Sequence, residues 1–259
     1  MPEKITSPQI DRIQRLVEEA LKGLPLSRDV VQRRVIEQGG LLKQRFAALV
    51  LALANSYFIL LSDEEAEEWY CKFAGKNEAD AKRIVLGYRR GAREEEIPDA
   101  EHCHVQVVSG VTLKQTIPTL GPCVEDFRYL KGWKFSDPPT KDCLFSLVPT
   151  LLRGSTGKTV GEQRALLAQV RQRLELPANH LTDFGSPTHL AGAALTHKAA
   201  GRDIFADKIA RTETCDSDGD RLCLSWDEGR LYCDCWYFAE ERGGDVGVVA
   251  CGVEQALGS

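Results

Sequence analysis

Three short runs of strand-forming residues stand close together in the last third of the chain, between about residues 211 and 254. Turn sequences that contain glycine separate these runs, which cover residues 221–226, 230–238 and 245–253. Short apolar runs divided by such turns are typical of antiparallel strands. The pattern therefore predicts a C-terminal antiparallel β-meander, and it favours a fold with a sheet over an all-helical one.

The middle run contains a single carboxylate, Asp234, among aromatic residues. Alternation along a strand places Tyr232, Asp234 and Trp236 on one face and apolar residues on the other. Both faces are rich in apolar residues, which predicts that both are covered. A carboxylate on a covered face is costly unless it is paired or protonated. Asp234, with Tyr232 and Trp236, is therefore the main candidate for ligand binding, and a buried carboxylate satisfied by a polar neighbour is the competing structural interpretation.

Residues 1–97 contain the start and stop signals of a series of helices. N-cap residues, apolar stripes and terminal glycines predict five helical segments, at about 7–24, 27–39, 41–61, 62–75 and 77–91. Ser62 and Glu65 have the spacing of a capping box. The acidic run at 94–96 and the proline at 98 have the composition of a solvated boundary. We therefore predict a helical region at 1–97 and an α+β domain at 98–259.

The middle of the chain changes from a helical to a strand-like period and back. Alternating residues at 103–108 and a second run at 111–117, with Ser-Gly between them, predict a hairpin. Two helices are predicted at 159–175 and 186–200 from their N-caps and apolar stripes. The predicted fold class is α+β: an N-terminal helical array, then a mixed region whose C-terminal meander is packed by these two helices.

The loop at 154–159, Gly-Ser-Thr-Gly-Lys-Thr, resembles a phosphate-binding loop because it stands between a strand-like run and a capped helix. Lys158 and Thr159 would be its phosphate ligands. The spacing does not fit, since the position of the first required glycine is Leu152. A polar loop that ends in a helix cap explains the same residues, so Lys158 and Thr159 are weak candidates.

Metal sites are the other chemistry that the sequence suggests. The aspartates of 216–220 have the alternate spacing of Ca²⁺ ligands, but a hairpin turn needs the same Asp-Gly sequence. His102 and His104 share a strand face that Gln106 continues, which indicates a polar edge facing solvent. Five cysteines fall between 215 and 251 without a C-x-x-C pair, which disfavours zinc. We predict no metal and no cofactor, and Ca²⁺ at the acidic turn stays open.

Cysteine content and the apolar runs bear on location. The chain has nine cysteines, an odd number, and its first residues lack the apolar core of a secretion signal. Free thiols in a reducing compartment fit this pattern. The strongest apolar run, 46–61, is shorter than the roughly 20 residues that cross a bilayer. We therefore expect a soluble, cytoplasmic protein without a membrane partner, and a buried helix at this run.

Three functions from different classes remain open. The first expectation is a non-catalytic binding or interaction protein with an unknown protein or small-molecule partner, because no catalytic motif is present. The first alternative is an enzyme with a site assembled from distant residues, Asp234 and a histidine being the simplest pair. The second is a nucleic-acid binder that uses a mildly basic set: Lys131, Lys134, Lys141, Arg153, Lys158, Arg164 and Arg171. A net charge of -5 and an acidic C-terminal third disfavour nucleic acid.

Overall fold

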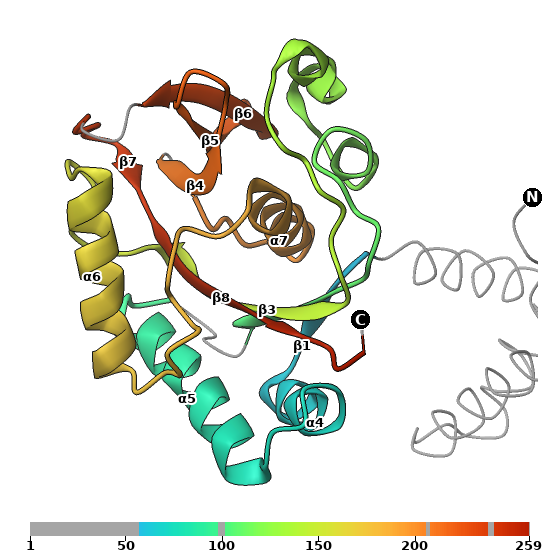
Figure 1. Ribbon diagram of the computed structural model, residues 1–259, viewed down its shortest axis with the longest axis vertical. Helices are drawn as coiled ribbons and strands as arrows, with labels where there is room; N and C mark the ends of the chain where they lie inside the picture. Colours follow the sequence, from blue (N-terminus) through green and yellow to red (C-terminus); the bar gives the residue numbers. More distant parts are fainter. Residues whose placement is uncertain (1–56, 98–101, 206–207, 238–240, 259) are drawn as a thin grey trace, which may run out of the picture. The chain divides into compact units, whose positions relative to one another are not determined.

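The computed structural model describes residues 57–97, 102–205, 208–237 and 241–258 (Figure 1), and the side chains of 235–237 are outside the description. These residues belong to a compact unit that spans Tyr57–Ser259. The first two predicted helices, and the third as far as residue 56, lie outside the described residues. The rest of the third, predicted as helical to residue 61, forms a strand instead.

Two four-stranded sheets organise the described part of the chain. Sheet A is antiparallel and has the order β1 (Phe58–Leu61), β2 (His104–Val107), β3 (Cys143–Leu151) and β8 (Val249–Gln255). Sheet B has the order β6 (Arg230–Tyr237), β5 (Arg221–Asp227), β4 (Ile209–Cys215) and β7 (Val246–Gly247). Within sheet B, β7 pairs with β4 in parallel. Both helices and sheets are present, as the α+β class requires.

The sheets and helices form layers (Figure 1). Helix α7 (Pro187–Ala199) lies between the two sheets, and a cluster of buried apolar side chains surrounds it. Helices α4 (Asp63–Phe73), α5 (Glu78–Glu94) and α6 (Val160–Arg173) contribute to a second apolar cluster on the opposite face of sheet A. Strand β3 is buried on both sides: Phe145 belongs to the first cluster and Leu144 to the second. Sheet A is therefore covered on both faces.

The helix starts follow the local sequence signals. The predicted capping boxes form at the N-termini of α4, with Ser62 and Glu65, and of α6, with Thr159 and Glu162. Each cap side chain accepts a hydrogen bond from the N3 backbone amide, which has no partner within the helix. Ser186 caps α7 in the same way and Pro187 is its first residue. These predictions are confirmed. They could be made from the sequence because capping depends on residues close in sequence.

The predicted three-stranded meander is wrong in its pairing. β5 and β6 form the expected hairpin around Glu228-Gly229, where both residues have positive φ. The third run instead divides: β7 joins sheet B beside β4, and β8 crosses to sheet A and pairs with β3. The physical reason is burial on two sides, because Ala250 and Cys251 of β8 belong to different apolar clusters. Such a strand fits beside the equally buried β3.

The predicted hairpin at 103–117 is also wrong in its second strand. β2 forms, but it pairs with β1 and β3. Residues 111–117 form no strand: residues 113–116 make turns, and Ile117 begins the short 3₁₀ helix η2 (Ile117–Thr119). Side chains take the place of a strand partner there. The Asp137 carboxylate accepts hydrogen bonds from the amides of Leu113 (2.8 Å) and Lys114 (2.9 Å), and Thr140 Oγ1 accepts one from Val111 (3.0 Å). Backbone donors satisfied by side chains need no strand ladder.

The border predicted between residues 97 and 98 does not mark the edge of the compact unit. Strand β1 and helices α4 and α5 precede it, yet β1 pairs with β2 and α5 packs on β3. The acidic run read as a solvated boundary makes specific contacts. Glu94 forms an ion pair with Arg173 of α6 (3.0 Å), and Glu95 accepts a hydrogen bond from the Arg153 amide (3.1 Å).

Candidate functional site

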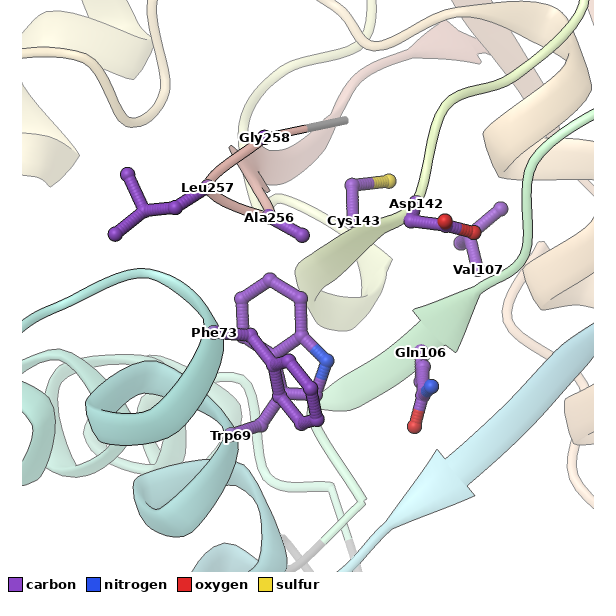
Figure 2. Close-up of a pocket in the computed structure, with 9 residues that line it drawn as sticks. All are labelled: Trp69, Phe73, Gln106, Val107, Asp142, Cys143, Ala256, Leu257 and Gly258. Atoms are coloured by element: carbon purple, nitrogen blue, oxygen red, sulfur yellow. The ribbon is translucent and has the colours of Figure 1, made fainter.

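A pocket of about 380 Å³ lies at one end of sheet A (Figure 2). Aromatic side chains of α4 form one wall and the C-terminal segment forms another, while the ends of β2 and β3 complete the lining. The lining residues are Trp69, Phe73, Gln106, Val107, Asp142, Cys143, Ala256, Leu257 and Gly258. Small-molecule sites in proteins have volumes of about 300–1,000 Å³, so this pocket is in the range for a small ligand.

The walls of the pocket are held by local structure. Trp69 and Phe73 stand one turn apart on α4, and their ring centroids are 5.7 Å apart. The amide of Leu257 donates a hydrogen bond to the Phe73 carbonyl (2.7 Å), and the amide of Ala256 donates one to the Asp142 carbonyl (3.0 Å). The C-terminal segment is therefore tied both to α4 and to the start of β3. These bonds keep the two walls at a fixed separation.

Two polar groups in the pocket have no hydrogen-bond partner among the described residues. They are the carboxamide of Gln106 and the indole nitrogen of Trp69, and the indole nitrogen is also not sealed from solvent. In Figure 2 this nitrogen lies on the side of the ring nearer Gln106. A third polar group, the Asp142 carboxylate, uses one oxygen to accept from the Ser109 amide (2.8 Å). The pocket thus combines apolar walls with a few convergent polar groups, as ligand sites do.

A buried polar network lies under the helical face of sheet A. Ser146 Oγ is 2.9 Å from Tyr70 Oη and 2.8 Å from His104 Nδ1. Nearby, the Tyr88 hydroxyl is 2.9 Å from His180 Nδ1, and all five of these side chains are fully buried. Burial raises the pKa of Tyr70 and lowers that of His104 to about 3. Tyr70 and His104 are therefore neutral, and each of the five side chains hydrogen-bonds to another member of the set, which is the arrangement expected of a structural network.

The network reaches the surface at Glu254 of β8. Its carboxylate is 3.4 Å from His180 Nε2, 2.9 Å from Lys76 Nζ and 3.2 Å from Asn179 Nδ2. Partial burial would raise the pKa of Glu254, but the hydrogen bonds from these three residues lower it to about 2. Glu254 is therefore ionised and fully engaged, and it links β8 to the residues around α4.

Cys143 and His189 form a thiol–imidazole pair behind the pocket. Cys143 Sγ is 3.5 Å from His189 Nε2, and His189 Nδ1 is 2.6 Å from Ser186 Oγ. Cys143 as nucleophile, His189 as base and Ser186 as the group that orients the base would resemble the arrangement of catalytic thiols. However, Cys143 is 1% exposed and its thiol points away from Trp69 and Gln106 (Figure 2). Burial raises the pKa of Cys143 to about 12 and lowers that of His189 to about 4, so the pair is neutral.

Asp234 lies in sheet B, away from these groups. It is half-buried, and its carboxylate accepts a hydrogen bond from the hydroxyl of Tyr232 (2.7 Å), which is also half-buried. Burial and then this carboxylate raise the pKa of Tyr232 to about 12. The Trp236 side chain is outside the described residues. Among those residues, no histidine hydrogen-bonds to Asp234, so geometry does not favour the enzyme site predicted there, which stays a prediction.

The loop of Lys158 and Thr159 uses its polar groups internally. The Thr159 amide donates to Glu162 Oε2 (2.9 Å), and the Gly157 amide donates to the Gly243 carbonyl (2.8 Å). Hydrogen bonds from Thr159 and Arg242 lower the pKa of Glu162, so a carboxylate already occupies the helix N-terminus. A phosphate would meet this negative charge. Phosphate binding at Lys158 and Thr159 therefore has no support from the geometry.

The arginines of the predicted basic set are engaged in local contacts. Arg153 pairs with Glu96 (3.4 Å), and Arg164 pairs with Asp183 (2.9 Å). Arg171 donates to the Ala178 carbonyl (3.1 Å). A stripe for phosphates needs cations that carboxylates have not neutralised. Nucleic-acid binding stays a prediction that these pairs disfavour.

The acidic turn and the cysteines are engaged in ordinary structure. Asp216 Oδ1 accepts hydrogen bonds from the amides of Asp218 (2.9 Å) and Asp220 (3.0 Å), which is the geometry of an Asx turn. Eight cysteines fall among the described side chains, and all are free thiols.

The residues of the pocket were not predicted from the sequence. The strand pattern predicts a solvent-facing edge for Gln106 and His104, but His104 is fully buried and Gln106 lines the pocket. Trp69 and Phe73 look like an apolar helix stripe in the sequence. The sequence feature that could have indicated the pocket is the spacing of four residues between Trp69 and Phe73 near a helix end, which places both rings on one face of the helix.

Two further findings concern membrane-spanning helices and similarity to known proteins. None of the helices in the described ranges is long and apolar enough to cross a membrane. No family model matches the chain, and no curated protein or solved structure is significantly similar to it.

Proposed function

We propose that this chain is a non-catalytic binding protein whose ligand site is the pocket between α4, the ends of β2 and β3, and the C-terminal segment. The observation that carries this proposal is the combination of apolar walls with unbonded polar groups at Gln106 and Trp69. Both groups are open to solvent in the pocket, so a ligand that hydrogen-bonds to them replaces water and breaks no hydrogen bond within the protein, at a net gain of about 0.5–1.5 kcal/mol for each bond. The ligand is a small molecule with an apolar body.

Exposed apolar side chains at the pocket support the proposal. Among the described residues, the large hydrophobic side chains that are exposed are Phe73 (42%), Leu86 (46%) and Leu257 (74%). Two of them, Phe73 and Leu257, line this pocket from opposite walls. Exposed apolar surface that gathers around a hollow marks a binding site more often than isolated exposed residues do.

The state of the neighbouring thiol supports binding without covalent chemistry. Cys143 is the nucleophilic side chain of the lining, but its thiol is buried and protonated, and its partner His189 is neutral. A reactive cysteine instead needs a lowered pKa and access to solvent. The pocket therefore offers contacts to a ligand and no activated nucleophile.

Titration with an uncharged fluorescent probe tests this proposal. N-phenyl-1-naphthylamine should bind saturably at one site per chain. The variant Ala256→Trp fills the pocket and should weaken binding at least about tenfold, which corresponds to about 1.4 kcal/mol. Ala165→Trp, at an exposed position of α6, is the matched control and should bind like the wild type.

Two results would contradict the proposed site. One is the absence of saturable probe binding to the wild type. The other is equal affinity of the two tryptophan variants, which would place the probe elsewhere. Circular dichroism and melting temperatures of both variants must first show that each is folded.

A further inference from the structure

This inference rests on the proposed function and concerns the class of ligand. The Gln106 carboxamide and the Trp69 indole nitrogen both belong to the lining of the pocket, on the helical face of sheet A. Neither makes a hydrogen bond within the described part of the chain. Figure 2 shows the indole nitrogen on the side of its ring that faces the strand carrying Gln106. A single ligand can therefore meet both groups.

The hydrogen-bonding capacity of these groups defines the complementary ligand edge. A carboxamide presents an acceptor oxygen beside a donor nitrogen, whereas an indole N–H donates only. The complement is a donor next to an acceptor, with a further acceptor for the indole. Cyclic amides and similar heterocycles carry such an edge in one plane.

Charge selects among ligands that carry this edge. The Asp142 carboxylate lines the pocket, and no ion pair to it is present among the described residues. The Asp142 carboxylate would repel a carboxylate or phosphate on a ligand in the pocket, because apolar walls strengthen interactions between charges. An uncharged ligand avoids this cost.

The walls select for a flat apolar body. Trp69 and Phe73 stand on one side, and Ala256 and Leu257 stand on the other. Aromatic side chains pack favourably on ring systems. A volume of about 380 Å³ is sufficient for a ligand of one or two fused rings.

We propose that the pocket selects an uncharged planar heterocycle whose edge places a hydrogen-bond donor beside an acceptor. The amide nitrogen of Gln106 donates to the ligand acceptor, and its oxygen accepts from the ligand N–H. The Trp69 N–H donates to a second acceptor where the ligand has one. The rings lie between the α4 side chains and the C-terminal segment.

A matched pair of bicyclic probes tests the inference. Quinolin-2(1H)-one carries the carbonyl acceptor beside an N–H donor, and its N-methyl derivative has the same rings without the donor. Isothermal titration should give an affinity at least about tenfold higher for the first compound. Naphthalene measures the affinity of the apolar rings alone and should bind no better than the N-methyl compound.

Variants assign the preference to Gln106. Gln106→Leu should bind both quinolinones with equal affinity, because it keeps the apolar contacts and loses both hydrogen bonds. Gln106→Glu keeps the acceptor for the ligand N–H and loses the donor to the ligand carbonyl, so it should bind both quinolinones more weakly and keep the preference for the N–H compound. Gln115→Leu, at an exposed turn position, is the matched control and should keep the wild-type preference.

The outcomes separate this inference from the proposed function. If the naphthylamine probe binds in the pocket but the wild type does not discriminate between the quinolinones, the inference is overturned and the proposed function stands. A preference that persists in Gln106→Leu overturns it equally. If neither the naphthylamine probe nor any bicyclic compound binds saturably, both the proposed function and the inference fail.

Discussion

Acidification from pH 7 to pH 5 should destabilise the protein by about 6 kcal/mol through three histidines, His104, His189 and His197, whose pKa values burial lowers. All three have pKa values near 6.5 when unfolded, and burial lowers that of His189 to about 4. In the folded state, burial and then the nearby His180 lower the pKa of His104 to about 3. Burial, followed by Arg202 and His102, lowers that of His197 to about 4.

The sign follows from proton uptake by the unfolded chain. Since the folded-state pKa values are depressed, the stabilisation is fully present above pH 6.5 and is lost as the pH falls toward 4. At pH 5 the unfolded imidazoles are almost fully protonated and the folded ones are mostly neutral. Each histidine then costs about 2 kcal/mol relative to pH 7. The carboxylate of Glu254 adds nothing in this interval, because its pKa is lowered to about 2 from 4.5 and its loss comes below pH 4.5.

Urea unfolding followed by circular dichroism at both pH values measures this loss, and His197→Leu is the informative variant. Among the described residues, neither ring nitrogen of His197 has a hydrogen-bond partner, and the side chain is fully buried. The leucine variant should therefore be at least as stable at pH 7 and should lose about 2 kcal/mol less on acidification. A wild-type change below about 1 kcal/mol, or an unaltered pH dependence in the variant, would refute the reasoning.

Three further predictions concern packing, a polar contact and the thiols. Gly252→Ala should lower the free energy of unfolding by about 1–3 kcal/mol, because the added Cβ would lie 2.6 Å from the Tyr88 hydroxyl. Urea titrations measure this change, and a variant as stable as the wild type would contradict the prediction. Tyr232→Phe removes a donor to Asp234 and should cost about 1 kcal/mol, seen as a lower melting temperature. Cys215 is exposed and should be alkylated by iodoacetamide before the buried described cysteines, as peptide mass spectrometry would show.

Features set by neighbouring residues could be predicted from the sequence, and features set by distant pairing could not. The caps at Ser62, Thr159 and Ser186 depend on residues three positions away, and all three form. The partner of β8 depends on which strand is buried on both faces, and apolar content alone does not identify that strand. Likewise, turns replace a strand at 111–117 because Asp137 and Thr140, far along the chain, satisfy its amides.

The candidate site was hidden from the sequence for a related reason. Trp69 is nearly buried and follows the period of an apolar helix stripe, so it resembles a core residue. Its neighbour Gln106 comes close only because β2 pairs in sheet A under α4. Asp234, which looked exceptional among aromatic residues, has an ordinary partner two positions away in Tyr232. Unusual local composition was therefore a poorer guide than the pairing of distant elements.

Polar groups that can hydrogen-bond to a ligand differ from those that stabilise the fold in their access to solvent. Ser146 bonds to Tyr70 and His104, and Tyr88 bonds to His180, all on the helical face of sheet A. Within the part of the chain that the structure describes, His197 has no hydrogen-bond partner and is sealed from solvent, so it can lower stability without contacting a ligand. The Trp69 N–H also has no partner in that part of the chain, but it is open to the pocket, and the Gln106 carboxamide lines the same pocket. A ligand that binds there gains hydrogen bonds without breaking any within the protein, and for this reason we propose this end of sheet A as the binding site.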